Sequence, residues 1–286
     1  MRVAGAPISW GVCEVPGWGH QMEPARVLAE MRALGLAATE LGPDGFLPGG
    51  ARAREELLAT YGLGLVGAFV PVVLHDPASD PLPVVDRVLD AMDGVLVLAA
   101  ATGLDGYDGR PELDVEAWTT LLANLDAITL RASARGRLVT LHPHVGTVVE
   151  RRTEVERVLD GCNVPLCLDT GHLLVGGTDP VWLARFAARR IAHVHLKDVD
   201  VGLAQRVLNG EVAYTHAVRD GLYRPLGDGD IGISGIVCAL EDAGYEGWYV
   251  MEQDTVLAEA PADGGGPYDD VRRSLDFLAS LAGAAR

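Results

Sequence analysis

The sequence is poor in cysteine, and the cysteines it has are not grouped. They stand at positions 13, 162, 167 and 238, with irregular spacing and no Cys-x-x-Cys pair. Disulfide frameworks and structural zinc sites both rely on recurrent cysteine spacing. The sequence therefore predicts free thiols in a reducing cytoplasm.

Long apolar runs and an excess of positive charge are also missing. No segment stays apolar over the roughly 20 residues needed to cross a bilayer, and the N-terminus lacks the pattern of a signal peptide. Lys and Arg number 23 against 40 Asp and Glu, a net charge of −17. Such a field repels nucleic acid and anionic membranes. The sequence predicts a cytoplasmic protein that acts on a small molecule, and a homo-oligomer is compatible with it.

Two common catalytic signatures are absent. No G-x-S-x-G elbow occurs, and no dinucleotide-binding glycine motif follows the first apolar run. The Gly227–Asp230 run, Gly-Asp-Gly-Asp, lacks the Lys and Ser/Thr of a phosphate loop, and its simplest interpretation is a turn. These absences favour metal-assisted chemistry on a small polar substrate over acyl or hydride transfer.

Short apolar runs alternate with helical patterns along the whole chain. The predicted strands are Val3–Trp10, Ala37–Leu41, Leu65–Val73, Val95–Ala101, Arg137–His142, Pro165–Asp169, Ile191–Leu196 and Trp248–Glu252. The predicted helices are Pro24–Leu34, Ala51–Tyr61, Pro83–Met92, Val115–Ala134, Thr153–Leu159, Pro180–Arg189, Ser234–Ala243 and Asp269–Leu281. Strict alternation predicts a parallel sheet, and eight units in 286 residues predict a closed (β/α)₈ TIM barrel in a single domain, residues 1–286. A doubly wound open sheet is the alternative.

Two predicted connections are longer than usual. Gly42–Gly50 follows the second strand, and Val199–Ile231 follows the seventh. Both lie at carboxyl ends of strands, where barrels keep their active sites, so we expect them to cover a substrate.

Metal-binding side chains gather where the last four strands end. The terminal runs are Leu141–Gly146, Asp169–His172, His193–Asp198 and Met251–Asp254. One histidine in an apolar strand is more often a core residue than a ligand. Four neighbouring strand ends that present His, Asp, His and Glu at one barrel mouth instead predict a divalent metal, since imidazole and carboxylate together suit Mn²⁺, Co²⁺, Zn²⁺ or Fe²⁺. No cysteine stands at these positions, which argues against a structural zinc site.

Other residues at this mouth have both a functional and a structural interpretation. Glu40 could bind a sugar hydroxyl, serve as acid or base, or form a salt bridge at the rim. Trp10 could face a sugar ring or pack in the core. Lys197, with a pKa lowered by a nearby cation, could act as acid or base, or pair with Asp198. We expect substrate contacts from a set at this mouth: Trp10, His144, His193 and Asp198.

Seven runs resemble the xylose isomerase-like barrel family of sugar isomerases, epimerases and dehydratases, and within it the inosose (2-keto-myo-inositol) dehydratases. The runs are Ala6–Gly11, Thr39–Gly45, His142–Thr147, Leu168–His172, His193–Asp198, Pro225–Asp230 and Gly244–Trp248. They extend over nearly the whole chain.

This resemblance implies a divalent metal, Mn²⁺ or Co²⁺ foremost and Zn²⁺ or Fe²⁺ as alternatives. Carried over by position, the implied ligands are His142, Asp169, His195 and Glu252. Ketose 3-epimerases of the family have Glu where His142 stands and move a proton with two carboxylates, of which only Glu252 remains here. The departure favours elimination over two-base epimerisation.

The resulting hypothesis is a hydro-lyase that acts on a cyclic keto-polyol or keto-sugar. Lys197 or Glu40 would remove the α-proton, and His172 or His144 would assist departure of the β-hydroxyl. Glu252 would bind the metal and also take part in proton transfer. Three alternatives remain at this point: a keto-sugar epimerase or isomerase, a DNA-repair nuclease that the charge opposes, and a sugar-binding barrel without metal.

Overall fold

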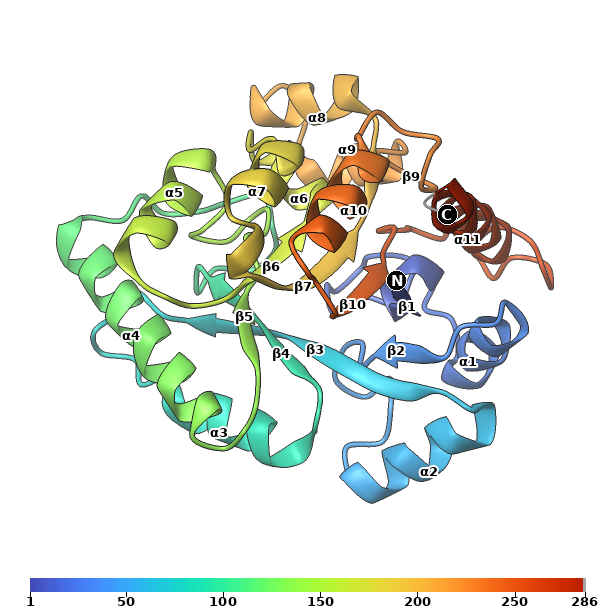
Figure 1. The fold of residues 1–286 in the computed structure, drawn as a ribbon, viewed down its shortest axis with the longest axis horizontal. Coiled ribbons are helices and arrows are strands. Elements are labelled where there is room, and N and C mark those ends of the chain that lie inside the picture. The colour runs from blue at the N-terminus through green and yellow to red at the C-terminus, as the bar shows by residue number, and fades with distance from the viewer. Residues whose placement is uncertain (285–286) are drawn as a thin grey trace.

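Eight parallel strands close into a barrel in the computed structural model, which describes residues 1–284 (Figure 1). Around the barrel the order is β1, β10, β7, β6, β5, β4, β3, β2. The strands are β1 (Arg2–Gly5), β2 (Ala38–Glu40), β3 (Gly64–Val73), β4 (Val95–Ala101), β5 (Val139–Leu141), β6 (Leu166–Asp169), β7 (Ile191–Leu196) and β10 (Trp248–Met251). The predicted (β/α)₈ TIM barrel is confirmed, and the alternative prediction of a doubly wound open sheet is wrong.

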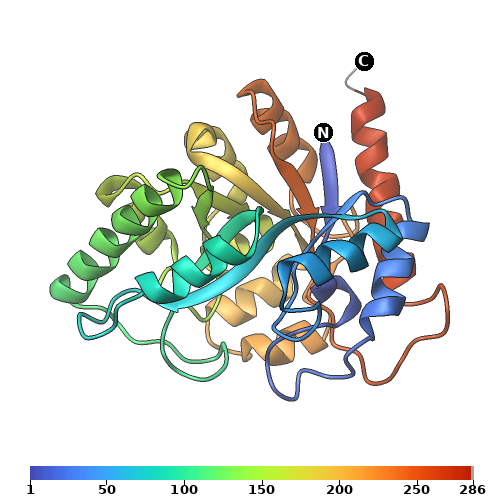
Figure 2. The ribbon, with the colours of Figure 1, turned by 90° about the horizontal axis from the view of Figure 1, so that it is seen from below.

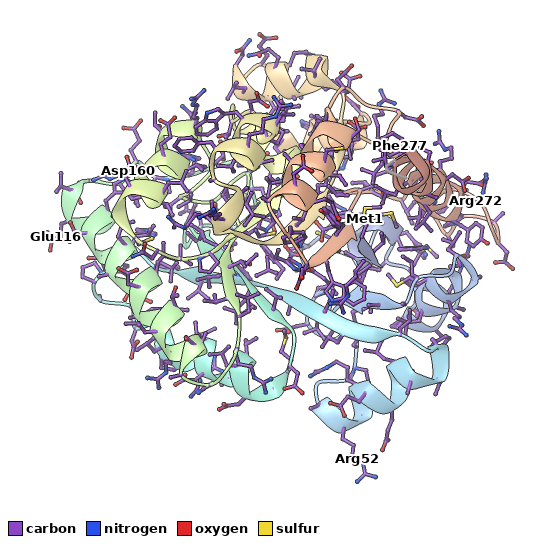
Figure 3. The ribbon with its side chains drawn as sticks, viewed as in Figure 1. Met1, Arg52, Glu116, Asp160, Arg272 and Phe277 are labelled. Atoms are coloured by element: carbon purple, nitrogen blue, oxygen red, sulfur yellow. The ribbon has the colours of Figure 1, made fainter. Side chains whose placement is uncertain are left out.

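Helices between the strands cover the outside of the barrel. They are α1 (Pro24–Ala33), α2 (Ala51–Tyr61), α3 (Leu82–Ala91), α4 (Val115–Ser133), α5 (Arg152–Gly161), α7 (Pro180–Phe186), α10 (Ile233–Asp242) and α11 (Pro267–Ala284). Exposed Arg52 on α2 and Glu116 on α4 point away from the ribbon (Figure 3). Within residues 1–284, no helix combines the length and apolarity needed to cross a membrane.

The barrel strands are buried on both of their faces. On β4, the successive residues Val97 and Leu98 are each fully buried, one facing the barrel interior and the other the helices. Helix α4 packs against the strands with an apolar face. The buried residues Leu121, Leu125 and Ile128 of this face repeat at the spacing of helical turns. Continuous apolar runs therefore mark barrel strands in this sequence.

The first strand is shorter than predicted. It ends at Gly5, and Pro7–Trp10 forms a 3₁₀ helix. Pro7 has no N–H to donate to a neighbouring strand, and its fixed φ suits the first turn of a helix. Trp10 therefore does not end a strand, as the sequence suggested, and its side chain is turned into the core.

The segment Val199–Ile231, predicted as a loop, is folded. It holds α8 (Val201–Leu208), α9 (Tyr214–Arg219) and the antiparallel pair β8 (Asp198–Val199) and β9 (Tyr223–Arg224). Its apolar side chains form a second core with Trp18 and Val145. Figure 2 shows this orange segment on the opposite side of the barrel from the two termini. It therefore covers the mouth where the barrel strands end.

Candidate active site

Strand register brings the four predicted metal ligands to one level. Asp169 is paired with His195 across β6 and β7. The amide of Glu252 donates to Leu196 O at 3.0 Å and so extends the β10 ladder by one residue. The amide of His142 extends β5 toward β4 in the same way. The ends of four strands thus aim their side chains at one point.

The side chains of these four residues form one connected cluster around Oδ2 of Asp169 and Nδ1 of His195. Oδ2 of Asp169 lies 3.2 Å from Nε2 of His142 and 3.5 Å from Nδ1 of His195. Oε2 of Glu252 lies 3.3 Å from the same His195 nitrogen. All four residues are buried. The structure therefore brings together the set that the sequence resemblance implied.

Asp169 is held by the short helix that follows it. Its Oδ1 accepts a hydrogen bond of 2.8 Å from the His172 amide and caps α6 (Thr170–Val175). One carboxylate oxygen thus fixes the side chain, and the other is free to face the site. This helix was not predicted, because six residues are too few to show a periodic pattern.

Glu40 supports the histidines of β7 from inside the barrel. Its Oε1 accepts from Nε2 of His193 at 2.8 Å and from Nε2 of His195 at 3.0 Å. Burial raises the pKa of Glu40, but the two imidazoles outweigh it and leave the pKa below its usual range. The two histidines share a face, as strand alternation predicts. His193 is therefore held by Glu40, and its predicted contact with the substrate stays a prediction.

The donor set fits a divalent cation. Nε2 of His195 is directed at Glu40, so its Nδ1 faces Asp169 and Glu252, and this buried nitrogen has no hydrogen-bond partner among the described residues. Burial lowers the pKa of His195, but the neighbouring acidic groups outweigh it and raise the pKa well above its usual value, so Nδ1 carries a proton without metal. A divalent cation between these groups could take the place of that proton. Two imidazoles and two carboxylates suit Mn²⁺, Fe²⁺, Co²⁺ or Zn²⁺. Three of these residues also form one of the compact groups of potential ligand atoms, namely Asp169, His195 and Glu252.

Lys197 lies against the same carboxylates. Its Nζ is 3.3 Å from Asp169, 3.0 Å from Glu252 and 2.9 Å from Asp254. Burial lowers the pKa of Lys197, but the three carboxylates outweigh it and raise the pKa well above its usual value. In the protein without metal, Lys197 therefore carries a proton. The lowering of its pKa by a nearby cation stays a prediction.

His144 and His172 stack beside the ligands, with ring centroids 3.7 Å apart. Both are buried, and burial lowers the pKa of each well below its usual value, with a further lowering from the neighbouring imidazoles and Lys197. Both rings are therefore neutral. Nε2 of His172 lies 2.9 Å from Nζ of Lys197, so a neutral base and a protonated amine are in contact.

Two predicted substrate contacts are instead engaged with the protein. Trp10 is 0% exposed, and its indole N–H donates to Glu30 at 2.7 Å. The carboxylate of Asp198 accepts from the amides of Gly227, Gly229 and Ile231. Packing explains Trp10, and Asp198 anchors the segment that covers the mouth.

Cys167 lies closer to the ligands than the sequence indicated. Its sulfur is within 4.8 Å of potential ligand atoms of His142 and His195. It precedes Asp169 by two residues on β6, so strand alternation could have placed it on the same face. Burial raises the pKa of the Cys167 thiol to about 11. The thiol therefore stays protonated at neutral pH.

Three polar residues of the site were not predicted. Asp254 follows Glu252 by two residues and contacts Lys197. Tyr214 donates to Asp254 at 2.8 Å, and the hydroxyl of Tyr223 lies 3.0 Å from that of Tyr214. Period-two spacing could have indicated Asp254. The two tyrosines come from a segment whose sequence shows no pattern typical of a barrel strand.

Loops from three connections close the mouth. The hydroxyl of Tyr107 contacts the carboxylate of Glu14, and its ring lies 4.9 Å from that of His144. The next residue, Asp108, accepts from the Thr215 hydroxyl at 2.9 Å. Gly42–Gly50 contributes to a neighbouring cavity of about 450 Å³ between residues 12–14, 21–24 and 43–46. None of the four metal-ligand candidates lines that cavity.

Comparison with known proteins places these features in a family. The family described as "Xylose isomerase-like TIM barrel" matches residues 28–281. The rhizopine catabolism protein MocC of Rhizobium meliloti is 32% identical, over 100% of this chain and 90% of its own length. The inosose dehydratase of Geobacillus kaustophilus is 32% identical, over 98% of this chain and 94% of its own.

Solved structures share the fold at lower identity. L-ribulose 3-epimerase has a TM-score of 0.70 and 16% identity, over 100% of this chain and 95% of its own. The IOLI protein, solved with a zinc atom, has a TM-score of 0.66 and 11% identity, over 98% of both chains.

Proposed function

Because the chain belongs to the xylose isomerase-like TIM barrel family, we propose that it is a metal-dependent hydro-lyase that removes water from a cyclic keto-polyol such as inosose. Relatives named inosose dehydratase cover nearly its whole length, at 26–32% identity. The observation that carries the proposal is the contact between Lys197 Nζ and His172 Nε2 at 2.9 Å beside the ligand cluster. It supplies a proton donor and a proton acceptor on one side of the substrate position.

The ligand cluster is proposed to hold one divalent ion through His142, Asp169, His195 and Glu252. When bound there, the metal would supply Lewis-acid polarisation of the substrate carbonyl. The IOLI structure, with its zinc atom, is consistent with a metal in this fold. Metal analysis of the purified protein identifies which of Mn²⁺, Co²⁺, Zn²⁺ or Fe²⁺ occupies the site.

Proton transfer is assigned to Lys197 and His172. Environments that hold one group protonated and its neighbour neutral are the mark of an acid–base pair. His172 would take the proton from the α-carbon, and the C–H electron pair would form the new double bond as the β-C–O bond breaks. Lys197 would give its proton to the departing hydroxyl, which leaves as water. The proton on His172 can then return to Lys197 across their 2.9 Å contact.

This assignment differs from the sequence-based one in which Lys197 or Glu40 is the base. Lys197 is protonated beside three carboxylates, and Glu40 is occupied by His193 and His195. His144 stacks on His172 and could shape the substrate pocket. Glu252 remains a proposed ligand that also contacts Lys197.

The test is incubation of the protein with inosose and each of the four metals. We expect absorbance from the trihydroxycyclohexane-dione product, loss of activity with a chelator and its return with metal. Incorporation of solvent deuterium into the substrate carbon without loss of water would instead identify a keto-sugar epimerase, the alternative reaction. Turnover of neither kind across a panel of keto-polyols and keto-sugars would overturn the proposal.

A further inference from the structure

Five buried side chains form a closed ring of polar contacts, four hydrogen bonds and one ion pair, beside the ligand cluster. Lys197 Nζ lies 2.9 Å from Nε2 of His172 and 2.9 Å from Oδ1 of Asp254. On the far side, Nδ1 of His172 lies 3.4 Å from the Tyr223 hydroxyl, which lies 3.0 Å from that of Tyr214. Tyr214 in turn reaches Oδ2 of Asp254 at 2.8 Å and closes the ring.

The lysine end of the ring fixes the direction of its hydrogen bonds. An ammonium group has three donors and no acceptor. Nζ of Lys197 is surrounded by three carboxylates, which can only accept, so Nε2 of His172 accepts from Lys197 and the ring proton stands on Nδ1. That proton points at the Tyr223 oxygen.

The carboxylate end gives the same direction independently. A carboxylate only accepts, so the Tyr214 proton is directed at Asp254. The Tyr214 oxygen must then accept from Tyr223, whose own oxygen is left to accept from His172. Both ends thus require the Nδ1–H form of His172.

We propose that Tyr214 and Tyr223 are positioning residues that hold His172 as its Nδ1–H tautomer and aim its Nε2 lone pair at Lys197 and the substrate. The chemical purpose of this tautomer rests on the proposed function, because only the Nε2 lone pair faces Lys197 and can accept the α-proton. The tautomer itself does not depend on which reaction is catalysed.

The backbone supports the close approach of these groups. At Gly171, a Cβ atom would lie 2.7 Å from a Tyr223 ring carbon and 2.8 Å from Cβ of Lys197. Only glycine leaves room for both side chains at this point. The two tyrosines are themselves at most 4% exposed and pack in the second core with Leu222 and Ala217. The insertion that covers the mouth therefore also supplies part of the site's hydrogen-bond network.

The first test is the tautomer of His172, read from two-bond ¹H–¹⁵N correlations of the ring in the full chain loaded with diamagnetic Zn²⁺. His172→Asn identifies the resonances. We expect a protonated Nδ1 and an unprotonated Nε2, with the Nδ1 proton shifted upfield in Tyr223→Phe. A proton on Nε2, or on both nitrogens, in the wild type at neutral pH would overturn the proposal. This readout needs no substrate, so it separates failure of the inference from failure of the proposed function.

The second test is steady-state kinetics of Tyr214→Phe and Tyr223→Phe on the keto-polyol that the wild type dehydrates. Loss of a partner that orients a catalytic group typically costs about 10- to 100-fold in activity, and we expect this loss in kcat, with KM within about threefold of wild type. Tyr249→Phe is the matched control. Its buried hydroxyl donates to Glu241 at 3.2 Å, away from the ring. Wild-type kcat in every tyrosine variant that folds would overturn the positioning role.

Discussion

Nε2 of His195 lies 3.0 Å from Oε1 of Glu40, and this contact determines which nitrogen of the ring faces the site. The carboxylate fixes the proton on Nε2 and leaves Nδ1 toward Asp169 and Glu252. Such outer partners orient a metal-binding imidazole and raise its basicity. The structure makes room for this carboxylate at Gly67, where a Cβ atom would lie 3.2 Å from Oε1.

Glu40→Gln is expected to weaken metal binding by about 10- to 100-fold, because the amide is a poorer acceptor and carries no charge. Isothermal titration of the metal-free protein with Zn²⁺ measures the effect. Glu30→Gln is the control, since Glu30 bonds to Trp10 at the outer side of the barrel. Equal Zn²⁺ affinity in the wild type and the Glu40 variant would contradict the assigned role.

Asp198 is expected to matter for stability of the insertion. Its side chain accepts from three amides between residues 227 and 231. Asp198→Ala would leave these amides without that partner, and we expect the free energy of unfolding to fall by about 3 kcal/mol. Asp200→Ala, which removes the cap of α8 at Leu203, should cost only about 1 kcal/mol. Urea unfolding measures both changes.

Hydrogen exchange locates the effect of the Asp198 substitution. Amides of residues 199–231 should lose protection while those of β4 keep it, because the insertion is held by Asp198 and the barrel strand is not. Uniform loss of protection over the whole barrel would show that Asp198 supports the core rather than the insertion.

We expect the free energy of unfolding to decrease below about pH 6.5 because His144 is buried as a neutral ring. Burial lowers the pKa of His144 well below its unfolded value of 6.5. Below about pH 6.5 the unfolded chain binds a proton there that the folded chain does not, so stability is present above this pH and lost as pH falls. His195, whose pKa is raised, is protonated in both states below that pH and adds no slope.

His144→Gln should therefore reduce the slope of unfolding free energy against pH by about 1.4 kcal/mol per unit between pH 6 and 5. Urea unfolding of the metal-free protein at several pH values gives the slope. His216→Gln, on α9, is the control for removal of one histidine. An unchanged slope in the His144 variant would show that this ring is protonated in the folded protein.

The barrel could be predicted from the sequence because burial on both faces leaves a continuous apolar run, as at Val95–Ala101 and Ile191–Leu196, where both strand bounds were correct. The candidate ligands could be predicted because carboxyl ends of parallel strands meet at one mouth. The first strand was predicted too long because the apolar run continues past Pro7. Pro7 has no N–H, so the hydrogen bonds between the strands end there.

The remainder of the site depends on contacts between segments distant in sequence. Tyr214 and Asp254 are 40 residues apart and come from different connections. The raised pKa of Lys197 results from three carboxylates on two other strand ends, whose distances no spacing encodes. The sequence identified Lys197 but could not indicate this direction of its pKa in the protein without metal.

The loop that carries Tyr107 covers the site and approaches the backbone closely at Gly146. Its φ is 77°, and a Cβ atom there would lie 2.5 Å from both Cα and O of Tyr107. Gly146→Ala should push Tyr107 away from His144 and raise KM by about tenfold, which corresponds to about 1.4 kcal/mol of binding. Limited proteolysis should also cut residues 104–110 faster, since the segment is displaced from the barrel.

Gly136→Ala is the control that distinguishes the steric effect on Tyr107 from the effect of backbone strain. Gly136 has a φ of 65°, so alanine there meets a similar left-handed penalty of about 1–2 kcal/mol. Among the described residues, however, no atom lies within 4 Å of a Cβ at Gly136. Both variants should thus lose stability, but only Gly146→Ala should raise KM. If KM rises equally in the two, general destabilisation explains the effect and Tyr107 does not retain the substrate.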